Sequence, residues 1–207
     1  CIETISGKNG VIIPPQSWWK GLKQAQLKYD LKIILDEVIC GFYRTQKSFG
    51  FQHFNFIPDV VCMGKAITGG MIPFGATFFS NEICCFYEQN TLSAGLTNYA
   101  HPLGLSATKA VVDLIYTSNF QKELEKNCIL LKDFSTNIVN KNAVKEIRII
   151  GMLMAIVLKS PLPYSHFLKE GLHIVVNKEL LILAPSLNME ARLLQESLKK
   201  LDHCLGD

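Results

Sequence analysis

Short apolar runs alternate along this 207-residue chain with segments whose apolar residues recur at helical spacing. The runs at 31–38 (LKIILDEV) and 60–63 (VVCM) are typical of buried strands. Residues 18–29 show helical spacing between apolar side chains, and we expect Ser17 to cap that helix. Alternation of this kind predicts an α/β fold, in which helices cover a largely parallel sheet.

The residue pattern of the sequence changes near residue 118, where a segment rich in Lys and Glu begins. Before it, we expect a strand within 75–80 and a helix that begins at Pro102. After it we expect two helices, one long strand over residues 147–158, two short strands and a final helix. We therefore predict two domains, 1–117 and 118–207, the second a smaller α/β domain.

Composition narrows the possible partners and compartment. The formal charge of +3 comes from 21 basic and 18 acidic residues without long runs, which favours neither a nucleic acid nor a membrane surface as partner. Seven cysteines without a CxxC pair, and five histidines without metal-ligand spacing, indicate a reducing compartment, the cytoplasm, and no metal site. The sequence shows neither a signal peptide nor a membrane span.

Two charged side chains follow apolar strands: Asp36 and Lys65. Ligands of open α/β sheets bind at the carboxyl ends of the strands. A desolvated lysine there can form a Schiff base, and an aspartate can keep a pyridinium nitrogen protonated, which are the groups that pyridoxal phosphate requires. Side chains alternate along a strand, so we expect Val38 to share the face of Asp36 and Glu37 to point away. The alternative for Lys65 is a side chain that extends into solvent.

Several motifs together resemble the class III aminotransferases, pyridoxal-phosphate enzymes of fold type I. They include ETISG, DEVICGFYRT, FIPDVVCMGKAITGG, LTNYAHPLGLSA and LILAPSL. The resemblance implies that Asp36 binds the pyridine nitrogen, that Val38 packs on the ring and that Lys65 is the Schiff-base lysine. It also implies that Thr97 reaches the cofactor phosphate of the neighbouring subunit in a homodimer, and that Glu3 lies near the cofactor.

The chain also departs from the family pattern. Many members carry glutamine at the position of Ser6 and proline at that of Thr4. Members that bind an α-carboxylate often have arginine at the position of Ile182, and a glutamate at that of Lys8 closes on it. Because an acid without its arginine would be costly, the joint change is physically consistent and favours another way of binding the substrate carboxylate.

The resemblance predicts the later part of a large mixed-sheet domain, residues 1–117, followed by a small carboxyl-terminal domain. Family members carry the phosphate cradle upstream of ETISG, so we expect an amino-terminally truncated catalytic domain. The implied activity is transfer of an amino group from an omega-amino or other amine donor to a keto acid. The alternative is an inactive remnant that acts as a binding or interaction protein.

Overall fold

The computed structural model describes residues 1–206, and their contacts divide the chain into two compact units. The first unit comprises Cys1–Thr4, Pro14–Phe42 and Lys47–Tyr116. The second comprises Ile5–Ile13, Tyr43–Gln46 and the chain from Thr117 onward. The predicted assignment of 1–117 to a cofactor-binding domain stays a prediction. Two short segments from the first part of the chain, Ile5–Ile13 and Tyr43–Gln46, belong to the second unit.

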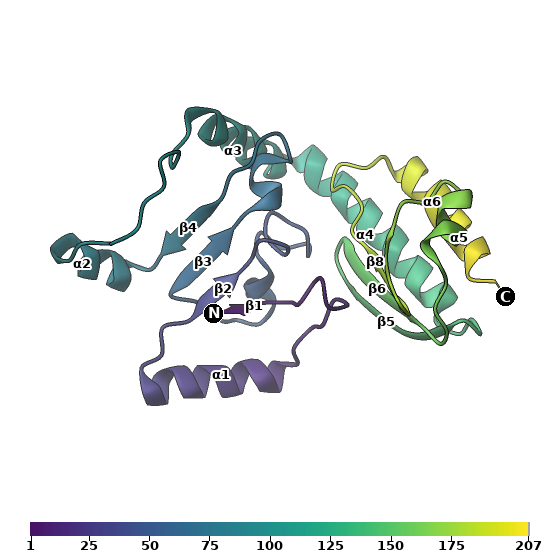
Figure 1. Cartoon of the computed structure of the whole chain (residues 1–207), viewed down its shortest axis with the longest axis horizontal. Coiled ribbons are helices and arrows are strands. Elements are labelled where there is room, and N and C mark those ends of the chain that lie inside the picture. Colours follow the sequence, from purple (N-terminus) through teal and green to yellow (C-terminus); the bar gives the residue numbers. More distant parts are fainter. Residues whose placement is uncertain (207) are drawn as a thin grey trace. The chain divides into compact units, whose positions relative to one another are not determined.

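The first unit is built on a four-stranded sheet of order β1-β2-β3-β4 (Figure 1). The strands are β1 (Ile2–Glu3), β2 (Ile34–Asp36), β3 (Val60–Met63) and β4 (Ala76–Phe79). The first three run parallel and β4 runs antiparallel to β3. The carboxyl ends of β1, β2 and β3 therefore lie at one edge of the sheet.

Helix α1 (Gln16–Tyr29) closes a hydrophobic core against this sheet. Trp19 is buried with Leu35 and Phe56, and its ring stacks on Phe54 at a centroid distance of 4.7 Å. The prediction of Ser17 as the cap is wrong. Pro15 occupies the N-cap position without a side-chain hydrogen bond, and its fixed φ suits the entry to the helix.

Helix α3 (Pro102–Ile115) begins at Pro102 as expected and contacts the short 3₁₀ helix η2 (Lys65–Thr68). Helix α2 (Asn81–Gln89) was not predicted, and it has no buried residue. Figure 1 shows it standing apart from the sheet of its own unit. Its apolar residues therefore find no core within the first unit.

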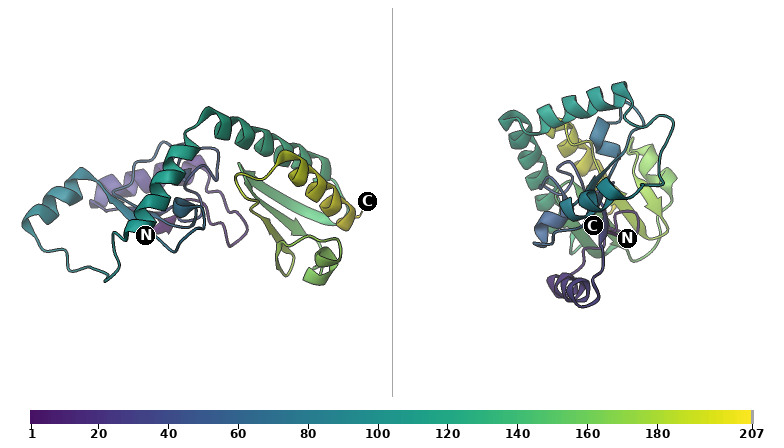
Figure 2. Two further views of the ribbon diagram at one scale, coloured as in Figure 1. Left: turned by 90° about the horizontal axis from the view of Figure 1, so that it is seen from above. Right: turned by 90° about the vertical axis from the view of Figure 1, so that its left-hand side faces the viewer.

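The second unit is an antiparallel sheet of order β5-β6-β8-β7 with helices on one face (Figures 1 and 2). Helices α4 and α6 pack against each other, and α5 contacts α6. The strands are β5 (Val144–Ile150), β6 (Leu153–Leu158), β7 (Val175–Asn177) and β8 (Leu180–Leu183), and the helices are α4 (Ser118–Ile138), α5 (Tyr164–Lys169) and α6 (Ala191–Cys204).

The prediction of one strand over residues 147–158 is wrong. The segment forms a hairpin of β5 and β6 that turns at Gly151, whose φ is +56°. A side chain at Gly151 would meet backbone atoms of Thr45 at 2.6 Å and of Arg44 at 2.8 Å. The Arg44 guanidinium in turn donates to the carbonyls of Met152 at 3.0 Å and Pro185 at 2.6 Å. These contacts explain why Tyr43–Gln46 groups with the second unit.

No helix of the described residues is long and apolar enough to cross a membrane. Residues 1–206 contain no cluster of three potential metal ligands.

Candidate active site

Three predicted site residues gather at the carboxyl edge of the first unit's sheet. In the strand register Glu3 lies beside Asp36, and Asp36 lies beside Cys62. Lys65 follows β3 by two residues. Parallel pairing therefore brings two carboxylates and one amine, from three separate parts of the sequence, to the same edge.

Asp36 is half-buried, and its Oδ1 accepts a hydrogen bond from the Val38 backbone N–H at 2.9 Å. Its other carboxylate oxygen makes no hydrogen bond with the described residues. The strand ends at Asp36, so Val38 lies in a turn and not on the extended strand that we expected. The strand ends early because the side chain of Asp36 bonds to its own backbone two residues on, a pattern typical of turns.

We expected a lysine at a strand end to be shielded from water. The side chain of Lys65 is instead exposed within the described residues. Its backbone has a φ of +46°, in the left-handed region that residues with a Cβ seldom adopt. Such backbone strain is concentrated at functional sites in proteins.

Gly64 directly precedes Lys65 and lies against Val38, the residue predicted to pack on the cofactor ring. It is buried and precedes η2 as its N-cap. A Cβ on Gly64 would lie 3.2 Å from Cγ1 and 3.3 Å from Cγ2 of Val38. The Val38 side chain therefore lies directly against the backbone that leads into Lys65.

Glu37 has a structural place that sequence reasoning missed. Its side chain is fully buried, whereas that of Asp36 is half-buried. One carboxylate oxygen accepts from the Thr4 hydroxyl at 2.5 Å and the Phe51 N–H at 2.9 Å, and the other accepts from the Gly50 N–H at 2.8 Å. Burial raises the pKa of Glu37 above its ordinary value, and the three donors oppose that rise.

The remaining predicted residues lie further from this cluster or serve other contacts. Thr97 lies in the segment 91–101, in which every residue is exposed. Ile182 lies in β8, paired with Ala155 and Val175, and Lys8 is exposed in a turn. Neither of the last two supplies an arginine-like or glutamate-like group at the positions where many family members have them.

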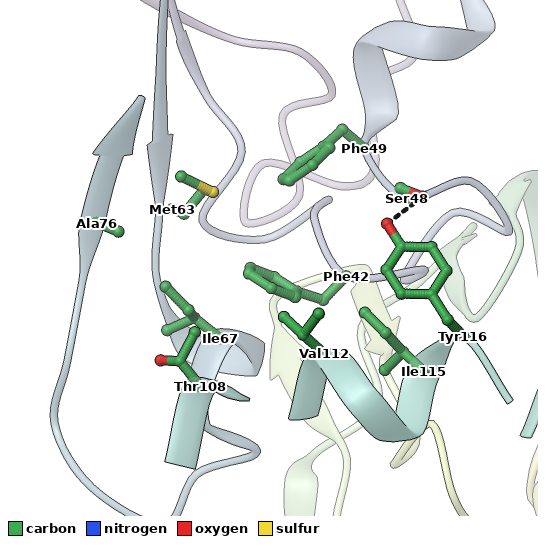
Figure 3. Close-up of a pocket in the computed structure, with 10 residues that line it drawn as sticks. All are labelled: Phe42, Ser48, Phe49, Met63, Ile67, Ala76, Thr108, Val112, Ile115 and Tyr116. Carbon is green, nitrogen blue, oxygen red and sulfur yellow. Dashed lines mark hydrogen bonds between the residues drawn. The ribbon is translucent and has the colours of Figure 1, made fainter. Parts of the chain in front are cut away.

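An apolar cavity of about 250 Å³ lies beside η2 (Figure 3). Phe42, Met63, Ile67 and Val112 contribute apolar walls, and Tyr116 stands at its side with its hydroxyl 3.4 Å from that of Ser48. None of the ten lining residues carries a charged side chain at neutral pH. The cavity therefore suits apolar groups and is not a phosphate site.

The chain is similar to known proteins in sequence and in structure. The model of the class III aminotransferases matches residues 1–205. A taurine:2-oxoglutarate aminotransferase from Bifidobacterium kashiwanohense, solved with pyridoxal phosphate and glutamate, is 30% identical, with a TM-score of 0.91 over 99% of this chain and 50% of its own.

Two further solved structures are similar. An ornithine aminotransferase from Plasmodium yoelii is 25% identical with a TM-score of 0.85, and the match covers 99% of this chain and 56% of that one. A pyridoxal-phosphate-bound amine transaminase from an uncultivated Pseudomonas species is 26% identical with a TM-score of 0.88, over 99% and 51%. The chain spans about half the length of these structures.

Proposed function

Because the chain belongs to the class III aminotransferase family and has the fold type I architecture of its solved relatives, we propose that it takes part in pyridoxal-phosphate-dependent transfer of an amino group. The transfer runs from an amine donor to a keto acid. The observation that carries the proposal is the convergence of Glu3, Asp36 and Lys65 at one sheet edge.

The residues at this edge fit pyridoxal phosphate. One oxygen of Asp36 is not engaged by the described residues and can pair with a protonated pyridine nitrogen. Val38 offers a branched apolar side chain beside Gly64 for the ring face. Lys65 presents an exposed amine for covalent attachment, and Glu3, one strand away from Asp36, borders the same position.

Bound pyridoxal phosphate supplies an electron sink for the negative charge that develops on a substrate carbon. Asp36 holds the proton on the ring nitrogen, because a carboxylate beside it favours the charged form. The Nζ atom of Lys65 would take and return the proton of the substrate carbon. Val38 would pack against the ring and exclude water from that side.

The donor we propose is an omega-amino compound or another amine. The position at which many family members bind an α-carboxylate through arginine is Ile182, paired within a sheet. The similar structures include enzymes named for taurine and for ornithine, which supports a donor of this class.

The activity is tested by incubating the purified chain with pyridoxal phosphate, a panel of omega-amines and α-amino acids, and either pyruvate or 2-oxoglutarate. The expected result is formation of the amino acid of the acceptor with at least one omega-amine, and its loss in Lys65→Ala. Product formed at the same rate by Lys65→Ala would refute the assignment, and no product with any pair would favour the non-catalytic alternative.

We also propose a homodimer, supported by an apolar surface on the first unit. Seven large hydrophobic residues between 78 and 105 are 44–77% exposed: Phe78, Phe86, Leu92, Leu96, Tyr99, Leu103 and Leu105. Exposed apolar side chains in this number within one stretch of chain are typical of a surface that binds another protein. Thr97 is exposed in the same stretch, and we propose that it reaches the cofactor phosphate of the partner.

Sedimentation measures this proposal directly. The wild-type chain should sediment as a dimer, and the double variant Phe86→Ser with Leu96→Ser should shift towards monomer. A variant with Leu27→Ser on α1, where Leu27 is 73% exposed outside the surface, should not. A monomeric wild-type chain would refute the dimer.

We propose the cytoplasm as the compartment. None of the seven cysteines forms a disulfide within the described residues, and burial raises the pKa of Cys128 to about 11, which keeps that thiol protonated. Free thiols in this number are usual in reducing compartments. Fractionation of cells that express the chain, followed by immunodetection, tests the assignment.

A further inference from the structure

Glu37 stands between the two residues proposed to hold the cofactor ring, yet its carboxylate does not face them. It is fully buried and bound by the Thr4 hydroxyl and the backbone N–H groups of Gly50 and Phe51. No Lys, Arg or His of the described residues forms an ion pair with it. Hydrogen bonds alone therefore hold this carboxylate.

All three of these groups donate to the carboxylate. A backbone N–H can only donate, and the Thr4 hydroxyl already directs its one proton to Glu37. The set matches a carboxylate, which accepts at both oxygens, better than a glutamine amide, which would place a donor against at least one of the three. The arrangement selects the acid at this position and not merely a polar side chain of its size.

The same residue ties together four segments around the turn. Its backbone N–H donates to Cys62 of β3 at 2.9 Å, and its carbonyl accepts from Gly41 at 2.8 Å. Its side chain reaches Thr4, just after β1, and the 3₁₀ helix η1 (Gly50–His53). A Cβ on Gly50 would lie 3.3 Å from both carboxylate oxygens, so η1 is seated closely on the group.

The segments so joined are those that position the site. The strand β1 carries Glu3, β3 leads to Lys65, and the turn after Asp36 carries Val38. Phe51, whose backbone N–H is one of the donors, packs against the core of Trp19 and Leu35. Glu37 thus links the turn to the hydrophobic core through Phe51, while one carboxylate oxygen of Asp36 makes no hydrogen bond with the described residues.

We propose that Glu37, with Thr4 as its donor, is a positioning residue that fixes the Asp36–Val38 turn in the geometry needed to bind the cofactor ring. The proposal rests on the proposed function for the identity of the ligand. Its geometric part concerns this chain alone and is tested without any cofactor.

The variants are Thr4→Val, which removes the hydroxyl at nearly constant volume, Thr4→Ser, which keeps it, and Glu37→Gln. Matched controls are Thr136→Val and Glu88→Gln, both at exposed positions of helices. Thr4→Val is the milder change and keeps the test open if Glu37→Gln does not fold.

The first measurement is amide hydrogen exchange in the cofactor-free chain. The Val38 N–H, which donates to Asp36, should exchange at least about tenfold faster in Thr4→Val and Glu37→Gln, because the opening free energy of the turn falls. It should keep its wild-type rate in Thr4→Ser and in both controls. Unchanged exchange at Val38 in Thr4→Val would overturn the proposal.

The second measurement is titration with pyridoxal phosphate followed by its absorbance. Thr4→Val and Glu37→Gln should weaken binding about tenfold, and Thr4→Ser should restore it. Variants that lower the unfolding midpoint but bind as tightly as wild type would show that Glu37 is merely structural. A wild-type chain that binds no pyridoxal phosphate would refute the proposed function, and the exchange rate of Val38 would still decide the role of Glu37.

Discussion

Gly64 and Val38 offer a direct test of the geometry beside Lys65. A methyl group on Gly64 would approach both methyl groups of Val38 to 3.2–3.3 Å, closer than the about 3.5–4.0 Å of an ordinary carbon contact. Overpacking of this kind costs about 1–3 kcal/mol. The φ of Gly64 is −165°, extended backbone that alanine adopts freely, so no conformational strain adds to the clash.

The sign of the effect should depend on Val38. In the wild-type background the clash outweighs the about 0.4–1 kcal/mol that alanine gains by restricting the unfolded chain, so Gly64→Ala should destabilise. In a Val38→Ala background the clash disappears and the same change should stabilise by that gain. Val38→Ala alone should cost about 1 kcal/mol, because its two methyl groups are half-buried.

Urea denaturation followed by tryptophan fluorescence measures the cycle, since both tryptophans, Trp18 and Trp19, lie on α1 of the same unit. The coupling free energy should be about 1–3 kcal/mol. Gly95, which has no neighbour within 4 Å of an added Cβ, is the control, and Gly95→Ala should not depend on residue 38. Additivity of the Gly64 and Val38 changes within about 0.5 kcal/mol would show that the two residues do not touch.

Three further predictions concern the charged residues of the edge. Lys65→Ala should abolish borohydride trapping of pyridoxal phosphate, detected by mass spectrometry, whereas Lys109→Ala on the exposed side of α3 should not; trapping that persists would remove Lys65 from its role. Asp36→Asn should still be trapped but should lower the rate of amino transfer about 10²-fold, since a neutral amide does not hold the pyridinium charge; a near-normal rate would contradict the assignment. Because burial raises the pKa of Glu37 above its ordinary 4.5, the folded chain takes up this proton more readily than the unfolded chain. The free energy of unfolding of wild type, relative to Glu37→Gln, should therefore fall as pH rises from about 4 to about 7 in urea denaturation, and a relative rise would reverse the sign of the burial effect.

The position of the candidate site at the carboxyl edge of the sheet could be predicted from the sequence. Asp36 and Lys65 follow apolar runs, and parallel pairing of such runs brings their carboxyl ends together whatever the exact lengths of the strands. The turn after Asp36 could not be predicted from the sequence. Alternation along a strand is a rule for extended backbone, and it ceased to apply where the Asp36 carboxylate bonded to the Val38 N–H.

Other differences have the same origin in contacts distant along the sequence. An apolar run with a central glycine, as at residues 147–158, reads equally as one strand or as a hairpin. What decides it is the backbone of Tyr43–Gln46, which leaves no room for a side chain at Gly151. Helix α2 was missed because its apolar residues are not arranged against any core of the first unit.

The adjacent acids Asp36 and Glu37 are chemically similar, and burial alone gives them different tasks. Burying the carboxylate of Glu37 without a cation costs free energy of folding, and an apolar side chain of the same size would avoid that cost. An apolar side chain cannot bond to Thr4, Gly50 and Phe51 at once, and so cannot hold the segment after β1 and the helix η1 against the turn. A costly buried acid immediately behind an accessible one is expected where the position of the accessible acid matters more than the stability of the chain.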